Sequence, residues 1–282
     1  MMIILPMSSL FVLAFLAAGA AVVTRPVANM HSAPSEDTDV VSQAILSTNV
    51  QILEEKDGWA RIRTPDDYTG WTLLSALKAS GKPYAASGRV AQVESLFAHL
   101  YRTASVTKFA PLMTAPYEVR LEVAGEPDEG KGRWIQVRLP DDRAGWVQRG
   151  DVTVEPKTMT IGETIAHARR FLGLPYTWGG TSSFGYDCSG FMQMLGRRRG
   201  VLLPRDADPQ ARWDGVRPVG KEGLQPGDLL YFGSAKRITH TGMYIGGGEF
   251  INFTTHEKPM GRIDRLDEEY WTKIFVCARR LK

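Results

Sequence analysis

The sequence predicts a multidomain protein in which two small all-β barrels are followed by an α+β domain. Three observations carry this prediction: a duplicated stretch in the first half, a change from alternating to helical patterning near residue 156, and a length of 282 residues. We expect the barrels to span residues 21–80 and 84–155, and the α+β domain to span residues 156–282.

The duplicated stretch recurs after 75 residues. Trp59–Trp71 and Trp134–Trp146 are identical at seven of thirteen positions, including a Pro-Asp-Asp turn and a Gly-Trp pair. Each copy has two alternating strands around that turn, as expected of a barrel of five or six strands. Residues 79–83 form a predicted linker, and a polar insertion at 126–131 predicts a longer surface hairpin in the second copy.

The α+β domain is predicted to open with a helix over residues 161–172, because Ile161, Ile165 and Phe171 recur at helical spacing. A second helix is expected after Cys188. A loop over residues 204–213 then leads to the strands of a small antiparallel sheet.

Cys188 is the strongest candidate for a reactive residue. It precedes a predicted helix over residues 189–199, which is amphipathic and is closed by Gly200. A thiol at a helix N-terminus faces unpaired N–H groups and the positive end of the helix dipole, which favour the thiolate. We therefore expect Cys188 to be a nucleophile, with Asp187 and Ser189 capping the helix and shaping the turn.

His240 is the best candidate for the base that such a nucleophile needs. It begins an apolar strand that turns at Gly246–Gly248 into a second strand containing Asn252. If the connecting loop has an odd number of residues, His240 and Asn252 share one face as diagonal neighbours, whereas an even loop would separate them. His256 has the same parity as Asn252 and is an alternative partner for His240.

The other cysteine, Cys277, lies in an apolar run near the C-terminus and is interpreted as a core residue of the last strand. A structural disulfide between Cys188 and Cys277 is the alternative, because paired cysteines are common in exported proteins.

Composition argues against several classes of partner. A net charge of +3 is too small and too dispersed for a nucleic-acid binder, although it allows loose attraction to an anionic cell envelope. No phosphate-binding loop is present, and the histidines show no metal-ligand spacing, so neither a metal nor a cofactor is expected. The five histidines are His31, His99, His167, His240 and His256.

Residues 1–20 are predicted to be a signal peptide. They have an apolar core over residues 10–18 and small residues at Ala18-Gly19-Ala20 that fit a signal-peptidase site, but no basic residue precedes the core. We expect an exported protein of the periplasm or extracellular space, with no stable membrane insertion after cleavage. A wrongly assigned start codon and an uncleaved anchor are the alternatives.

Five motifs in the last part of the chain resemble the NlpC-type cysteine peptidases of bacterial cell walls in order and spacing. The resemblance covers residues 156–282 and implies a reduced papain-like fold. The implied triad is Cys188, His240 and Asn252, where the family often has histidine at the third position, and Tyr176 is the implied oxyanion partner of the Cys188 N–H. The motifs are Leu174–Gly180, Asp187–Gly190, Leu203–Asp206, Gln225–Phe232 and Gly242–Asn252.

The duplicated barrels resemble bacterial SH3-like domains, and the whole chain is similar to YkfC-type γ-D-glutamyl-L-diamino acid endopeptidases. That resemblance implies hydrolysis of the bond between γ-D-Glu and a diamino acid, diaminopimelate or lysine, in murein peptides. The resemblance implies that Asp206 binds the free amine of the N-terminal L-Ala. It also implies that the Tyr68 side chain closes the active-site groove at that end. Asp187 and Ser189 complete the predicted substrate-contacting set, whereas Ala207 stands where a hydroxyl residue is common.

Three other functions stay open from the sequence. A wall hydrolase could act on intact peptidoglycan stems, and an acyltransferase or amidase could use the same Cys-His pair. A non-catalytic wall-binding protein is the third alternative. The charged loop Arg205–Asp208 favours a peptide over a lipid substrate.

Overall fold

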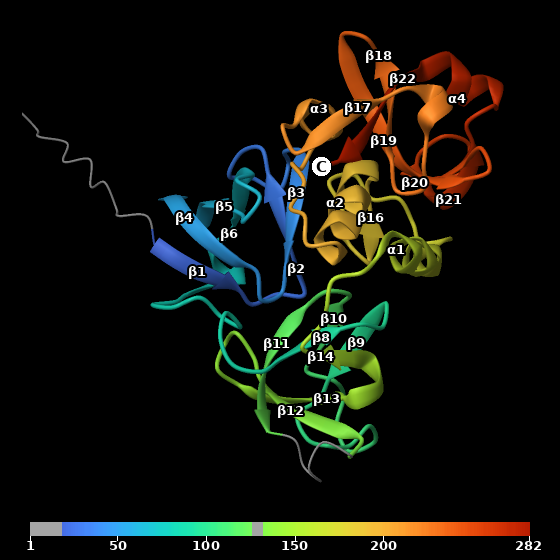
Figure 1. The fold of residues 1–282 in the computed structure, drawn as a ribbon. Helices are drawn as coiled ribbons and strands as arrows, with labels where there is room; N and C mark the ends of the chain where they lie inside the picture. Colours follow the sequence, from blue (N-terminus) through green and yellow to red (C-terminus); the bar gives the residue numbers. More distant parts are fainter. Residues whose placement is uncertain (1–18, 126–131) are drawn as a thin grey trace, which may run out of the picture.

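The computed structural model describes residues 19–125 and 132–282, which form three units (Figure 1). Two β units lie beside a larger α+β unit that begins at Ile161. Residues 1–18, most of the predicted signal peptide, and the predicted insertion at 126–131 lie outside the described residues. In the described ranges, no helix has the length and apolar character needed to cross a membrane.

The first β unit is an antiparallel sheet with the strand order β3-β2-β6-β5-β4-β1-β7. Its first strand begins at Gly19, two residues before the predicted boundary, but the buried part of that strand begins at Ala21. Alternating side chains of the strands, such as Ala60 and Ile62, form the core. The elements are β1 (Gly19–Val23), β2 (Val27–His31), β3 (Val40–Ile45), β4 (Asn49–Lys56), β5 (Trp59–Arg63), β6 (Thr69–Leu73), η1 (Leu74–Ala76) and β7 (Leu77–Ala79).

The second β unit has the same strand order as the first. Its five-stranded sheet runs β13-β12-β11-β8-β14, and the bridge between Tyr101 and Trp146 attaches the β9–β10 hairpin to β13. The resulting order, β10-β9-β13-β12-β11-β8-β14, matches the first unit strand for strand. The elements are β8 (Val90–Val93), β9 (Phe97–Leu100), β10 (Met113–Pro116), β11 (Arg120–Gly125), β12 (Trp134–Arg138), β13 (Ala144–Gln148), η3 (Arg149–Asp151) and β14 (Val152–Val154).

The repeated Pro-Asp-Asp turn explains why the two units share sequence. Asp67 and Asp142 occupy the left-handed region with φ of 61° and 69°, which aspartate tolerates better than most residues. Packing explains the glycine of the Gly-Trp pair in the first unit, because a Cβ at Gly70 would lie 2.9 Å from the Cβ of Met30. The Pro-Asp-Asp turn and the close contact at the glycine together fix the positions of the two strands that flank the turn.

The α+β unit packs its helices against a six-stranded sheet ordered β17-β22-β18-β19-β20-β21. The predicted first helix is confirmed as α1 followed by a 3₁₀ turn, and the predicted loop over residues 204–213 contains a short helix, α3, stabilised by an Asp208–Arg212 ion pair. The elements are α1 (Ile161–Ala168), η4 (Arg169–Phe171), β15 (Thr181–Ser182), β16 (Gly185–Tyr186), α2 (Cys188–Arg198), α3 (Ala207–Arg212), β17 (Val216–Val219), η5 (Lys221–Gly223), β18 (Leu229–Ser234), β19 (Arg237–Gly246), β20 (Glu249–Thr254), β21 (Met260–Arg265), α4 (Glu269–Ile274) and β22 (Phe275–Leu281).

Candidate active site

Cys188 is the first residue of α2 and is buried, with 7% of its surface exposed. Asp187 caps the helix, since its Oδ1 accepts a hydrogen bond of 2.7 Å from the Gly190 N–H. Glycine is required at position 190 because a Cβ there would lie 2.2 Å from the carbonyl oxygen of Gly180. The N-terminus of α2 is therefore held tightly against the backbone of the Trp178-Gly179-Gly180 segment.

His240 and Asn252 lie on one face of the β19–β20 hairpin. The register pairs Met243 with Ile251 and Tyr244 with Phe250, which makes the two polar residues diagonal neighbours. The turn beyond Gly246 and Glu249 is even, and a bulge between Tyr244 and Gly246 supplies the extra residue that an odd connection needs. His240 Nε2 and Asn252 Oδ1 are 3.0 Å apart. His256 has another partner, since its ring stacks on Tyr270 with centroids 3.6 Å apart. Asn252, and not His256, therefore contacts His240.

Asp264 on β21 fixes the orientation of the Asn252 amide. Asn252 Nδ2 donates to Asp264 Oδ2 at 2.8 Å, and the other carboxylate oxygen of Asp264 pairs with Arg262. Because a carboxylate only accepts here, the amide oxygen of Asn252 must face His240, so His240 Nε2 carries the proton and donates it. The lone pair is left on Nδ1, where a base needs it. The sequence alone did not indicate Asp264, because its contact with Asn252 depends on how β21 pairs with β20.

The thiol and the histidine strand are neighbours. Helix α2 packs directly on β19, and the backbone amides of Thr241 and Ser189 lie within hydrogen-bonding reach of the Cys188 thiol. Tyr176 is also close, because the charge of a Cys188 thiolate would raise the pKa of its hydroxyl, which burial already raises. The structure thus gathers Cys188, Tyr176 and the strand of His240 at one place.

Burial dominates the titration of both reactive groups. It raises the pKa of Cys188 to about 12, with Asp187 adding to the effect and the two neighbouring amides opposing it. Burial lowers the pKa of His240 to about 4, against the hydrogen bond to Asn252. The resting site therefore favours a neutral thiol beside a neutral imidazole. The sequence-based expectation of a stabilised thiolate counted the helix N-terminus but not this burial.

Trp271 of α4 covers the imidazole of His240. The two rings are stacked, with centroids 5.1 Å apart and an interplanar angle of 27°, and Trp271 is 1% exposed. This large apolar cover keeps water from one face of the imidazole and so contributes to its burial. The sequence did not indicate this role, because Trp271 lies in the short helix between β21 and β22.

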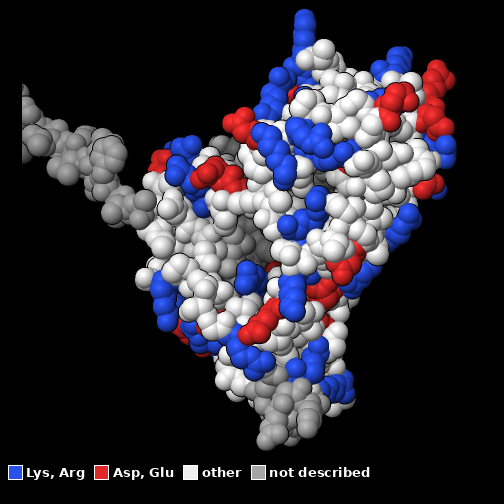
Figure 2. All heavy atoms as spheres, in the orientation of Figure 1, with Lys and Arg blue, Asp and Glu red and all other residues white. Residues whose placement is uncertain are grey.

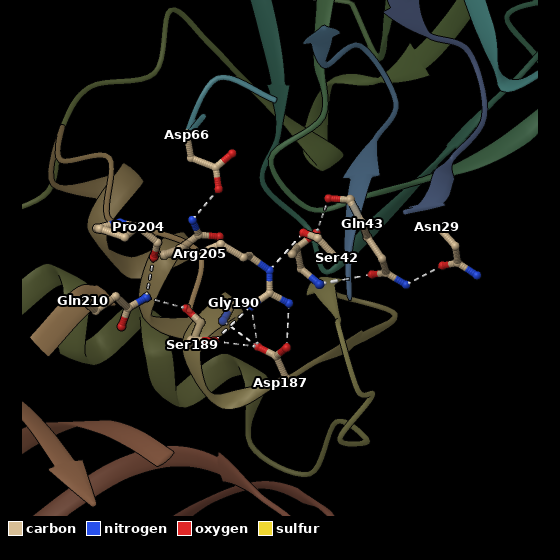
Figure 3. Close-up of polar contacts among 12 residues, drawn as sticks. Asn29, Ser42, Gln43, Asp66, Asp187, Ser189, Gly190, Pro204, Arg205 and Gln210 are labelled. Atoms are coloured by element: carbon tan, nitrogen blue, oxygen red, sulfur yellow. Dashed lines mark hydrogen bonds and ion pairs between the residues drawn. The ribbon is translucent and has the colours of Figure 1, made fainter. Parts of the chain in front are cut away.

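Arg205 ties the turn around the nucleophile to the first β unit (Figure 3). Its guanidinium binds both carboxylate oxygens of Asp187, at 3.1 and 2.6 Å, and the Ser189 hydroxyl at 2.9 Å. On its other side, Nε donates to Ser42 Oγ of β3 at 2.9 Å. Arg205 is 2% exposed, so these partners replace the water that a buried cation has lost.

These contacts revise the roles predicted for Asp187 and Ser189. Both were placed in the substrate-contacting set, but both are buried and their side chains are turned to Arg205 and to the helix cap. They hold the nucleophile in position. Capping, the other role expected of Asp187, is confirmed by its bond to Gly190.

Tyr68 and Asp206 meet across the boundary between the first β unit and the α+β unit. The Tyr68 hydroxyl lies within hydrogen-bonding reach of the Asp206 carboxylate, and both side chains are half-buried. Burial raises the pKa of Tyr68 to about 12, and it also raises the pKa of Asp206 although Arg205 and Tyr68 oppose this. The structure thus brings together the two residues predicted to close one end of the site.

The structure contains no disulfide between Cys188 and Cys277, because both are free. Cys277 lies on β22 opposite Tyr231 of β18, in the last strand as predicted, and is partly exposed.

Comparisons with known proteins agree with this arrangement. Residues 173–280 match the NlpC/P60 family, and residues 30–77 match the bacterial dipeptidyl-peptidase Sh3 domain. A gamma-D-glutamyl-L-lysine dipeptidyl-peptidase of Bacillus cereus is 30% identical over 262 residues, which are 85% of this chain and 74% of the relative. A protein of the same name from Bacillus subtilis is 37% identical over 139 residues, 48% of this chain and 46% of that relative.

A solved structure shows the same architecture. The crystal structure of an NlpC/P60 family protein from Bacillus cereus has a TM-score of 0.80 at 26% identity and covers 93% of this chain and 99% of that chain. Fold, sequence match and the buried Cys-His arrangement together define a cysteine peptidase. The chain belongs to the NlpC/P60 family, and an SH3-like domain precedes its catalytic domain.

Proposed function

We propose that this enzyme hydrolyses the bond between γ-D-Glu and the L-diamino acid of free murein peptides that begin with an unblocked L-Ala. The observation that carries the proposal is the contact between Tyr68 and Asp206, because a half-buried carboxylate beside an aromatic side chain would suit a free ammonium group. The printed names of the Bacillus relatives, gamma-D-glutamyl-L-lysine dipeptidyl-peptidases, support the bond type.

The proposed chemistry is acyl transfer to Cys188 followed by hydrolysis. Nδ1 of His240 takes the thiol proton as sulfur attacks the γ-carbonyl carbon, and it then gives that proton to the leaving amine of the diamino acid. The developing oxyanion is held by the Cys188 N–H and the Tyr176 hydroxyl, whose raised pKa keeps it a donor. A water molecule, activated by His240, then releases the L-Ala-γ-D-Glu acyl group and restores the thiol.

Selectivity for a free amine follows from the charge of Asp206. The ammonium of L-Ala would pair with this half-buried carboxylate, whose pKa burial has raised against the opposing effect of Arg205. An intact stem has its L-Ala amide-linked to the sugar, so it brings no cation and collides with Tyr68. The loss of one charged hydrogen bond at a half-buried site costs about 1–3 kcal/mol, which is roughly tenfold to a hundredfold in kcat/KM.

The decisive experiment compares L-Ala-γ-D-Glu-diaminopimelate with its N-acetylated form, with products identified by mass spectrometry and Cys188→Ala as the inactive control. We expect cleavage of the free peptide and at least tenfold lower kcat/KM for the blocked one. In Asp206→Asn, kcat/KM for the free peptide should fall at least tenfold toward that of the blocked form. The lysine-containing peptide, run in parallel, identifies the preferred diamino acid.

Each other outcome selects a different function. Equal cleavage of free and blocked peptides would refute the closed end and point to a hydrolase of intact wall stems. Failure to cleave either peptide, with Cys188 still reactive toward iodoacetamide, would point to an acyltransferase or amidase that uses another acceptor.

We further propose that residues 84–155 are a second SH3-like domain. The strand order of this unit is that of the first, and the elements β5 and β6 recur as β12 and β13 at a separation of 75 residues. Only the first unit matches the SH3 sequence family directly, so a crystal structure of the second unit that superposed poorly on the first would refute this.

We also propose that residues 1–20 direct export to the periplasm or extracellular space. Cleavage after Ala20 would remove the two exposed residues of β1 and keep its buried residues from Ala21 to Val23. The intact mass of the exported protein tests this, since a mature chain beginning at Met1 would contradict it.

A further inference from the structure

A polar pocket lies where the three units meet, apart from the active site. Its volume is about 470 Å³, which is the size of sites that hold small molecules. Figure 2 shows a hollow between the units with basic side chains at its rim. Its lining comes from β3 and the turns after β3 and β5, from the second β unit, and from the C-terminal half of α2 with the residues that follow it. It includes none of Cys188, His240, Asn252, Tyr68 and Asp206.

The acidic groups of the pocket are already paired. Glu118 binds Arg197 at 2.7 Å, and Asp66 accepts from Gln193 Nε2 at 2.8 Å. Arg120, in contrast, is exposed on β11 and forms no ion pair with any residue in 19–125 or 132–282. The lining therefore has one cation whose charge is not balanced by the protein.

Two further donors in the lining have no acceptor in the part of the chain that the structure describes. Gln92 Nε2 is buried without a hydrogen bond, and so is Nε of Arg198, whose Nη2 reaches Glu94 at 3.4 Å. Both residues are 7% exposed. A buried donor without an acceptor costs free energy, and an acceptor on a ligand would recover it after a small side-chain adjustment.

Part of the wall is apolar. Leu46, Val201 and Leu202 line the pocket, and Leu202 is 44% exposed although it is a large apolar side chain. An inorganic anion would leave this surface uncovered, whereas an organic acid with an apolar part would cover it.

We propose that this junction pocket binds a small organic carboxylate, with its carboxylate on Arg120 and Gln92 and its apolar part against Val201 and Leu202. Arginine suits a carboxylate because its planar donors match both oxygens. The site goes beyond the hydrolytic function, and no active-site residue takes part in it. Its occupant contacts the second β unit and the α+β unit, so it stabilises the packing of these two units.

Isothermal titration with N-acetyl-L-glutamate tests the proposal. This probe has no free amine for Asp206, so it does not report on the proposed active site. We expect saturable one-to-one binding that weakens at least tenfold in Arg120→Gln, weakens less in Arg120→Lys, which keeps the charge but not the planar donors, and is unchanged in Asp206→Asn. Arg143→Gln, an exposed arginine of the same unit that pairs with Asp141, is the matched control and should bind like the unaltered protein.

Gln92→Leu provides a second test that does not depend on a surface charge. Because the amide of Gln92 has no partner, its loss should leave the melting temperature unchanged or higher while binding weakens. Equal affinity in Arg120→Gln and the unaltered protein would overturn the proposal, as would the absence of binding. Inorganic phosphate that binds as tightly as the probe would overturn the carboxylate assignment.

Discussion

At the scale of single residues, the reactivity of Cys188 is set by a competition between two environments. The helix N-terminus and the amides of Thr241 and Ser189 favour the thiolate, whereas burial and the Asp187 carboxylate favour the thiol. Burial wins, and it also keeps His240 neutral. Proton transfer then belongs to the acylation step, when the polar substrate has entered the site.

The state of the thiol can be measured by alkylation. In a Cys277→Ala background, the rate of Cys188 modification by iodoacetamide should keep rising through pH 9, because a pKa raised to about 12 keeps the thiol protonated at neutral pH. In the pH profile of kcat, the fall on the acid side should lie well below pH 6.5. A pKa of about 4 keeps His240 neutral, and so able to accept a proton, down to that range. An alkylation rate that levels off below pH 7 would instead establish a resting ion pair.

Asp264 is a positioning residue, and Asp264→Asn should expose its role. An amide at position 264 could donate to Asn252 and allow its amide to turn, so that its NH₂ group faces His240 and the proton moves to Nδ1. We expect kcat to fall at least tenfold with little change in KM, because substrate contacts are untouched. Asp267→Asn, at an exposed position on the same segment, is the control.

A purely structural role for Asp264 would give another result. The variant would then lose thermal stability while kcat, measured well below its melting temperature, stayed within twofold of the unaltered enzyme.

The residues of the site divide by how they could be found. Cys188, His240 and Asn252 were predictable, because a helix start and a glycine turn restrict their local geometry. Asp264, Arg205 and Trp271 were not, because each acts through a partner on an element whose position depends on tertiary packing.

At the scale of elements, hairpin parity and the internal repeat were the most informative signals. The turn between β19 and β20, Gly247–Gly248, has an even number of residues, but a bulge between Tyr244 and Gly246 adds one residue and puts His240 and Asn252 on one face. Period-two patterns can predict which face a residue lies on but not such a bulge. The strand pairings of the β units that join distant parts of the chain, such as β1 with β7, were likewise beyond local patterns.

At the scale of the whole molecule, the first β unit contacts the residues that support the nucleophile. It supplies Tyr68 to Asp206, Ser42 to the buried Arg205 and Asp66 to Gln193 of α2. Because Arg205 also holds Asp187, the position of Cys188 depends on the docking of a separate domain.

Ser42→Ala tests this dependence. Loss of its hydrogen bond leaves the buried Nε of Arg205 unpaired, which should lower the free energy of unfolding by about 1–3 kcal/mol. Because the docking of Tyr68 is loosened too, KM for the free peptide should rise several-fold. Ser75→Ala, an exposed serine of the same unit, should change neither quantity. An unchanged KM would show that the contact serves stability alone.

The link between Ser42 and Arg205 joins residues that are 163 positions apart in the chain. The nucleophile turn therefore acquires its last support only after the first and the final domain have both been synthesised, folded and joined. A complete chain that has not yet folded would contain every chemical group of the peptidase and yet lack its working geometry. Activity is thus delayed until assembly is complete.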